Sequence, residues 1–235
     1  MLILALDTCD ARGSIALLHG LQVLGEVSHL ANEEYSSWLL PAIDKLLQDN
    51  RVSHSDLAGY AVASGPGSFT GVRVGLTTAK AWSEVYTKPI FPVSRLAVLA
   101  DCAPAAAGYA AVFIDALRSQ LFAALYRRAG ADWKQISEES VIAPLEFFES
   151  VAETTGKAHT AFVSLDPQIL TTSPFWQSRK GGHGELVTVN PPLAAKIGMR
   201  ASRDANPQGV DALILDANYV RRSDAEIFGK KAAGS

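Results

Sequence analysis

Two aspartates stand where a carboxylate could act on a metal ion bound to a nucleotide. Asp7 follows the apolar run of residues 2–6, and Asp115 follows the apolar run of residues 112–114. Carboxylates at the ends of two buried strands can flank a cleft and form a metal-directed pair. Asp is also a preferred turn residue, because its side chain accepts hydrogen bonds from nearby backbone N–H groups. A metal-directed pair and two turn caps are therefore both open for Asp7 and Asp115.

A glycine-rich loop with the sequence GPGSFTG occupies residues 65–71. It follows an apolar run at 57–63 and precedes a helical pattern at 72–86, for which Thr70 is the expected N-cap. Backbone N–H groups at the start of a helix can hold an anion. The loop is not a P-loop, because no Gly-Lys-Ser/Thr follows, and its third glycine comes one residue late for a dinucleotide fingerprint. Phosphate binding and a tight strand-to-helix turn are the two alternatives.

Other kinds of catalytic or metal site find no support in the sequence. The five histidines are scattered singly, so none has a neighbour at metal-ligand spacing. Cys9 and Cys102 lie far apart and fit neither a redox pair nor a zinc site, which indicates a reducing cytoplasm. A formal net charge of -3 gives no electrostatic footprint for nucleic acid. We therefore predict no catalytic residue and no metal ligand, and any contact with RNA would be shared with a partner.

The elements that position these residues follow from the apolar pattern. Residues 2–6 predict a buried strand, since the run is too short for a membrane span and has no basic leader. Strand-like runs at 14–18 and 21–27 flank His19-Gly20, which predicts a hairpin and a three-strand meander. Apolar residues at helical spacing predict an amphipathic helix over 35–47, with Pro41 inside it.

The second half resembles the opening of the first, and both internal duplication and a chance match in an α/β protein are open. After a junction at 104–108, the runs 112–115 and 118–125 again give a buried strand that ends at Asp, a turn with Arg, and a returning strand. Further segments indicate a helix near 145–151, strands at 161–165 and 186–189, a loop over 171–184 and a helix from Pro192 to Met199. This predicts an α/β protein with an N-terminal lobe at 1–103, a C-terminal lobe at 104–228 and a disordered tail at 229–235.

Small residues recur every four positions along the second predicted helix, at Gly71, Gly75, Ala79 and Ser83. Positions i and i+4 share one face of a helix, so another element could approach this face closely. Packing against the chain's own sheet or first helix and packing against a partner helix are both open. Two residues nearby, Trp82 and Leu76, favour a partner surface.

Several strings of this sequence resemble the TsaB family, also called YeaZ. The most specific is GPGSFTGVRVG at 65–75, and Asp7-Thr8 and residues 115–126 match family positions as well. Similar strings at 39–44, 89–96 and 219–223 extend the resemblance over nearly the whole chain, most weakly at 133–209.

The resemblance implies a two-lobed actin-like ATPase fold, related to ribonuclease H, with a duplicated mixed-sheet lobe. It also implies a non-catalytic subunit that binds and activates the catalytic paralogue TsaD, together with the ATPase TsaE. The complex forms N6-threonylcarbamoyladenosine in tRNAs that decode codons beginning with A, so tRNA is met only through the complex. In that family the partner carries the metal-binding histidines, which agrees with the unpaired histidines here.

The resemblance also implies two sets of site residues. The predicted helices would form a bundle with the equivalent helices of TsaD, and in isolation they would pair with themselves in a C2 homodimer. The residues expected at this interface are Trp38, Leu39, Ile43, Gly71, Val72, Gly75, Leu76, Thr78, Ala79 and Trp82. The residues expected to line a vestigial nucleotide cleft are Asp7, Thr8, Gly65, Gly67, Ser68 and Asp115.

Two departures from the family weaken phosphate contact in that cleft. Cys9 stands where Ser is common, and Ser64 stands where Arg is frequent. We therefore expect no cofactor of the chain's own, while ADP or ATP at a partner interface stays open. The competing functions are a small actin-like kinase or ATPase that uses Asp7 and Asp115 and, less favoured, a glycoprotease-like peptidase.

Overall fold

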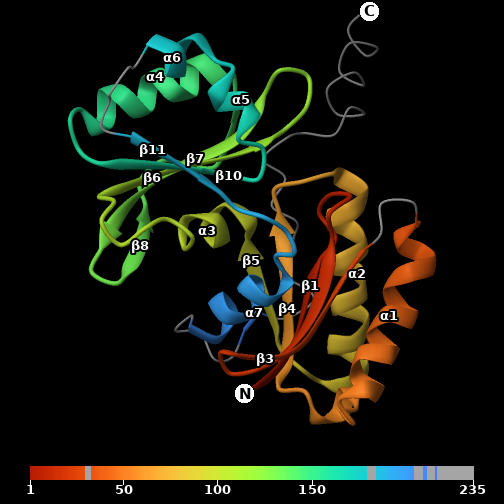
Figure 1. Cartoon of the computed structure of the whole chain (residues 1–235). Helices are drawn as coiled ribbons and strands as arrows, with labels where there is room; N and C mark the ends of the chain where they lie inside the picture. The colour runs from red at the N-terminus through yellow and green to blue at the C-terminus, as the bar shows by residue number, and fades with distance from the viewer. Residues whose placement is uncertain (30–32, 179–183, 204–208, 211–214, 216–235) are drawn as a thin grey trace, which may run out of the picture. The chain divides into compact units, whose positions relative to one another are not determined.

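The computed structural model describes residues 1–29, 33–178, 184–203, 209, 210 and 215. These residues form two compact units, each built on its own β-sheet (Figure 1). Met1–Val98 and the described residues from Asn190 onward form the first unit, and Leu99–Val189 belongs to the second. The sequence-based division at 103/104 had put the residues after 190 with the second lobe. The expected tail at 229–235 lies outside the described residues.

The first unit contains a five-stranded sheet in the order β3-β2-β1-β4-β5. Its strands are β1 (Leu2–Asp7), β2 (Ser14–His19), β3 (Gln22–Ser28), β4 (Gly59–Gly65) and β5 (Ile90–Ser94). The first three form the predicted antiparallel meander, and Gly20 adopts a φ of +61° in its hairpin turn. β4 lies parallel to β1 and β5 parallel to β4. The carboxyl ends of β1, β4 and β5 therefore meet at one edge of the sheet.

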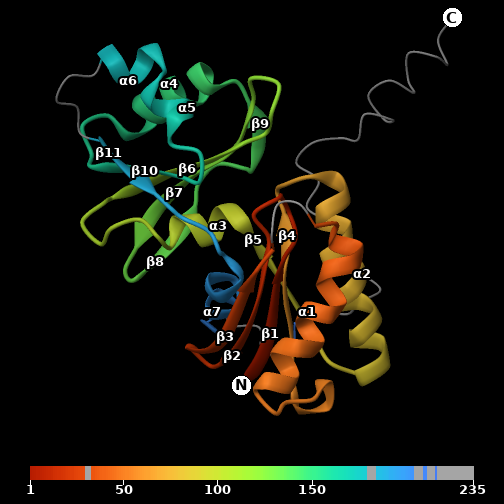
Figure 2. The same ribbon diagram turned by 45° about the vertical axis from the view of Figure 1, so that its right-hand side comes forward.

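Helices cover both faces of this sheet. On one face lie α1 (Tyr35–Asp49), which contains Pro41 as predicted, and α2 (Phe69–Tyr86); on the other lies α7 (Ala194–Arg203), as Figures 1 and 2 show. At the start of α7, Ala194 N donates to Ser14 Oγ at 3.0 Å and Ala195 N donates to Glu26 Oε1 at 2.9 Å. These bonds to β2 and β3 explain why α7 belongs to the first unit.

The second unit repeats the strand order and directions of the first. Its main strands are β6 (Tyr109–Asp115), β7 (Leu121–Ala129), β8 (Asp132–Gln135), β10 (Thr160–Ser164) and β11 (Gly184–Thr188). The order β11-β10-β6-β7-β8 combines an antiparallel meander with two parallel additions, and a short β9 (Ser140–Ile142) pairs with β7. The predicted duplication is thereby confirmed, and the chain has the repeated mixed sheet of the actin-like fold.

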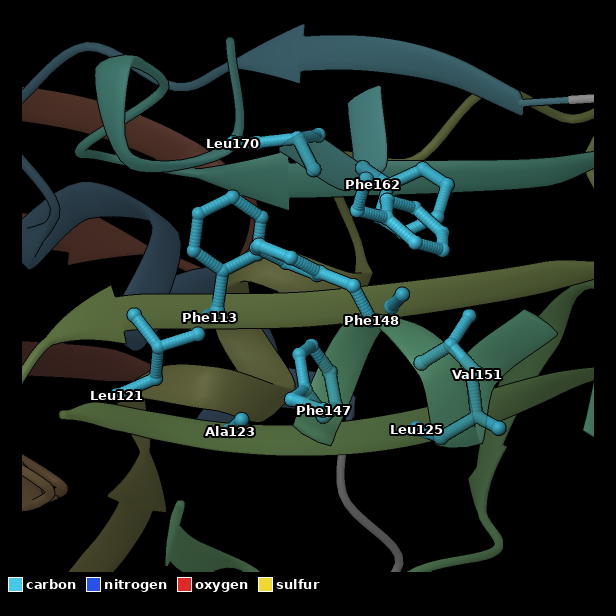
Figure 3. Packing of buried hydrophobic residues seen from close by; sticks show 11 residues of the cluster. Phe113, Leu121, Ala123, Leu125, Phe147, Phe148, Val151, Phe162 and Leu170 are labelled. Atoms are coloured by element: carbon cyan, nitrogen blue, oxygen red, sulfur yellow. The ribbon is translucent and has the colours of Figure 1, made fainter. Parts of the chain in front are cut away.

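The core of the second unit is rich in phenylalanine. The sheet packs against α4 (Pro144–Thr155), α5 (Gln168–Thr171) and α6 (Pro174–Ser178). Phe148 lies at the centre of the cluster, with its ring centroid 5.3 Å from that of Phe113 and 5.5 Å from that of Phe175 (Figure 3). The loop expected over 171–184 is wrong at α6, whose Phe175 is buried in this core. No helix in the described parts of the chain is long and apolar enough to cross a membrane.

Candidate functional site

The ends of β1 and β4 bring most of the predicted cleft residues together. Because these strands are parallel neighbours, the turn after Asp7 meets the loop after Gly65. Thr8 Oγ1 donates to Gly71 O at 2.6 Å, and Ser68 N donates to Cys9 O at 2.7 Å. The first unit thus collects five of the six residues, namely Asp7, Thr8, Gly65, Gly67 and Ser68. Asp115 lies in the second unit, at the end of β6.

The glycines of the loop allow one backbone segment to touch another. A Cβ atom at Gly67 would collide with Cys9 O, and one at Gly71 would collide with Thr8 O. Ser68, not Thr70 as expected, is the N-cap of α2, and its Oγ accepts a hydrogen bond from Gly71 N at 2.9 Å. The helix begins earlier than predicted because Ser68 already has the extended backbone of a cap. The start of α2 is capped by the chain itself, and the loop lies directly against β1.

The residue that fills the space beside Asp7 is Arg95, which was not among the predicted site residues. Arg95 begins α3 (Arg95–Ala100) directly after β5, and its side chain is only 1% exposed. Its Nε lies 3.3 Å from Asp7 Oδ2, and its Nη2 lies 2.8 Å from Asp10 Oδ2. Its Nη1 donates to Pro66 O at 3.3 Å. One guanidinium thus joins the turn after β1 to the loop after β4.

The charges at this strand end compensate one another. Burial alone would raise the pKa of Asp10, but the charge of Arg95 and the hydrogen bonds from Arg12 and Arg95 hold it well below its usual value. Burial opposes the charge of Arg95, yet Asp7 and Asp10 outweigh it and raise the pKa of the guanidinium. Burial, followed by the charge of Asp7, raises the pKa of the Cys9 thiol. The thiol is therefore a protonated, unreactive group.

A divalent cation with its nucleotide does not fit this arrangement. Asp7 is 0% exposed, its Oδ1 accepts a hydrogen bond from Cys9 N at 3.0 Å, and its Oδ2 faces Arg95. A cation there would have to lie beside a buried positive charge, which is unfavourable at low dielectric. Among the described residues, no group of three His, Cys, Asp or Glu side chains could hold a metal ion.

The N-terminus of α1 is fastened to the same turn. The Tyr35 hydroxyl donates to Asp10 O in a short hydrogen bond. His29, just after β3, stacks on the Tyr35 ring at a centroid distance of 4.2 Å, and Trp38 meets the His29 ring edge-on at 5.0 Å. The helix is thereby tied to the strand ends by one polar contact and one aromatic cluster.

The small-residue stripe of α2 faces its own sheet. Gly71, Gly75 and Ala79 are buried, and a Cβ at Gly75 would lie 2.6 Å from Thr8 Oγ1 and 3.4 Å from Val62 Cγ2. The absent side chains let α2 approach β1 and β4 closely. Of the two alternatives left open for the stripe, packing against the chain's own sheet is the one that the Gly75 contacts support.

The other expected interface residues form a buried group and a partly exposed group. Leu39, Ile43, Val72 and Leu76 are buried within the first unit. Trp38, Thr78 and Trp82 stay partly exposed and could reach a partner.

Comparison with known proteins decides the family. The tRNA threonylcarbamoyladenosine biosynthesis protein TsaB of Bacillus subtilis is 33% identical over 65% of this chain and 67% of the relative. TsaB of Escherichia coli is 31% identical over 67% of this chain and 69% of the relative. The chain belongs to the TsaB family. YeaZ of Pseudomonas aeruginosa superposes with a TM-score of 0.73 at 25% identity, covering 91% of this chain and 96% of that chain. A family model described as TsaD, tRNA N6-adenosine threonylcarbamoyltransferase, matches residues 22–163.

This member of the TsaB family also exposes apolar side chains on the two helices. On α1, Leu40 is 50% exposed, and on α2, Val85 is 72% exposed. At the start of α2, the Arg73 guanidinium carbon lies 3.5 Å from the centroid of the Phe69 ring. Near its end, Trp82 packs on the His54 ring at 4.5 Å. The outer surface of α1 and α2 thus offers aliphatic and aromatic groups beyond those predicted from the TsaB pattern.

The last predicted cleft residue, Asp115, is engaged in a turn. Asp115 Oδ1 accepts a hydrogen bond from Leu117 N at 2.7 Å, and Asp115 N donates to Asp166 Oδ2 at 3.0 Å. Leu117, Arg118 and Ser119 all have positive φ, at 61°, 56° and 57°. Of the two interpretations left open for Asp115, turn capping is the one that these contacts support.

Proposed function

We propose that this chain is a subunit without catalytic activity of its own, which binds and activates the paralogue TsaD together with the ATPase TsaE. The complex would form N6-threonylcarbamoyladenosine in tRNAs that decode codons beginning with A. The names of the relatives support the pathway, and the match to the TsaD family model supports kinship with a transferase. With a net charge of -3, the chain would meet tRNA only through its partners.

The observation that carries the proposal is the buried pairing of Asp7 with Arg95. A phosphoryl-transfer enzyme needs a carboxylate that is free to hold its metal ion. Asp7 is fully buried and its charge is already balanced by a guanidinium 3.3 Å away. Asp7 is therefore not available to bind the metal ion that a kinase or ATPase mechanism requires.

The proposed partner surface is the outer side of α1 and α2. Its proposed contacts are the partly exposed Trp38, Thr78 and Trp82, together with the exposed Leu40 of α1 and Val85 of α2. Aromatic and aliphatic side chains at the centre of an interface supply most of its affinity. The equivalent helices of TsaD would complete a bundle, and without TsaD the same surface would form a C2 homodimer.

The decisive experiment is reconstitution of tRNA modification. TsaD, TsaE, the adenylate-forming enzyme and tRNA are combined with and without this chain, and the modified nucleoside is measured by mass spectrometry. We expect modification only when the chain is present, and no ATP turnover by the chain alone. Equal modification without the chain would refute the proposal, and ATP turnover that disappears in Asp7→Ala would point to the kinase.

The surface is tested by a charge placed on it. Leu40→Glu should weaken TsaD binding by about tenfold or more, because a charge at an interface centre must be desolvated. Leu145→Glu, at a 48% exposed leucine of α4 in the second unit, is the matched control and should bind normally. Titration calorimetry measures both, and equal affinities would move the interface away from α1.

A further inference from the structure

At the carboxyl ends of β1 and β4, oxygen atoms of the kind that bind a hard cation point at one side chain, that of Arg95. Three oxygen atoms surround the Arg95 guanidinium: Asp7 Oδ2, Asp10 Oδ2 and Pro66 O. Carboxylate and backbone carbonyl oxygens are the ligands that Mg²⁺ and Ca²⁺ take in proteins. A guanidinium is always charged and bonds the same kinds of oxygen with its planar fork.

We propose that Arg95 is an internal counter-cation, which takes the place of a divalent cation between Asp7 and Asp10. The inference goes beyond the partner-binding role, since it concerns how the chain holds its strand-end loops in place with a side chain of its own. It also predicts a latent property: removal of the guanidinium exposes a site for a divalent cation.

Burial distinguishes this arrangement from a surface ion pair. The side chains of Arg95 and Asp7 are 1% and 0% exposed, and Asp10 is 22% exposed. Three separate segments meet here: the end of β1 with its turn and the loop after β4, which supply the partners, and the start of α3, which supplies Arg95. No local sequence preference brings these segments together. The guanidinium is therefore the contact that all three share.

The balance of charge indicates what removal of Arg95 would leave behind. Asp10 Oδ2 also accepts a hydrogen bond from Arg12 Nη2 at 2.9 Å, and Asp10 Oδ1 accepts one from Arg12 N at 2.8 Å. Asp7 has no second cation within ion-pair distance among the described residues. Without Arg95, Asp7 would be a buried carboxylate without a counter-charge, and a small cation could enter through the partly exposed side of Asp10.

The experiment measures thermal unfolding of the purified chain in EDTA and in Mn²⁺ or Mg²⁺. The wild-type midpoint should not change with the cation. Arg95→Ala should unfold roughly 10 °C lower in EDTA, because breaking a buried ion pair is strongly destabilising. Added Mn²⁺ should then raise its midpoint in a saturable manner, by about 5–10 °C at a hundredfold excess over the dissociation constant.

Two further variants keep the test decisive. Arg95→Ala/Asp7→Asn removes the unpaired charge and should lose the response to Mn²⁺. Arg95→Gln removes the charge but keeps polar contacts, and it should fold and gain the Mn²⁺ response.

A saturable response of the wild type equal to that of Arg95→Ala would overturn the proposal. So would folded Arg95 variants that ignore the cation, or variants that fail to fold in Mn²⁺ as well as in EDTA. None of these outcomes depends on TsaD, so they are independent of the partner-binding proposal.

Discussion

Gly75→Ala separates the two interpretations of the small-residue stripe on α2. The added methyl group would lie 2.6 Å from Thr8 Oγ1 and 3.4 Å from Val62 Cγ2. The first distance is too short for two non-bonded atoms. Thr8 cannot simply rotate away, because its Oγ1 donates a buried hydrogen bond to Gly71 O at 2.6 Å.

Three contributions set the change in the free energy of unfolding. Alanine in place of glycine within a helix stabilises by about 1 kcal/mol. Overpacking costs about 1–3 kcal/mol, and loss of the Thr8 hydrogen bond costs about 1 kcal/mol. We therefore expect Gly75→Ala to destabilise the isolated chain by roughly 1–3 kcal/mol.

Urea unfolding followed by circular dichroism measures the effect. Ala81→Gly, on the exposed side of the same helix, is the control and should cost about 1 kcal/mol through helix propensity alone. In a Thr8→Ala background the colliding oxygen is gone, so Gly75→Ala should lose most of its cost and the two changes should be coupled. A gain in stability of about 1 kcal/mol for Gly75→Ala in the wild-type chain would refute the packing against β1 and restore the stripe as a partner surface.

Three further predictions concern stability. Leu117→Gly should stabilise the chain by about 1 kcal/mol, because Leu117 has a φ of 61° that glycine adopts without strain. The control Leu145→Gly, within α4, should destabilise it by about 1 kcal/mol. The urea midpoints of the two variants and the wild type measure both effects. Phe148→Ala should cost about 3–5 kcal/mol in the same assay, because Phe148 is 0% exposed at the centre of the second core. The pKa of Asp10 is lowered in the folded chain, so its ion pairs stabilise above the unfolded pKa of about 3.9 and lose their effect as the pH falls toward the folded pKa. The stability advantage of wild type over Asp10→Asn should thus shrink below about pH 4, and an advantage that is constant with pH would contradict it.

The elements of the fold that the sequence predicts are those with a local signal. The apolar run before Asp7 predicted β1, and the helical spacing of apolar residues in 35–47 predicted α1. Each of these signals lies within a single short segment of the chain. Placement of α7 depends on hydrogen bonds to Ser14 and Glu26, residues more than 160 positions away in the chain. No periodicity within 192–199 carries that information.

In the candidate site too, local features were predicted and contacts between distant segments were not. Spacing alone shows that Gly71, Gly75 and Ala79 share a helix face, but it leaves open which element covers that face. Arg95 carried a signal that could have been used, since it is a lone charge between the apolar β5 and the apolar remainder of α3. A charge in such a position is rarely buried without a partner, and Asp7 was one of the two predicted carboxylates at a strand end.

The contacts at the strand end connect stability to the proposed interface. Arg95 holds Asp10, and the backbone of Asp10 accepts the Tyr35 hydroxyl at the start of α1. Arg95→Gln should therefore loosen the first turns of α1, although Arg95 itself is buried and cannot touch a partner. Hydrogen exchange of the α1 amides should increase in this variant, and its affinity for TsaD should fall while Leu145→Glu leaves both unchanged. Unaltered exchange in α1 would show that the strand-end network and the helix are independent, and that the aromatic contacts of Tyr35 with His29 and Trp38 are enough to hold it.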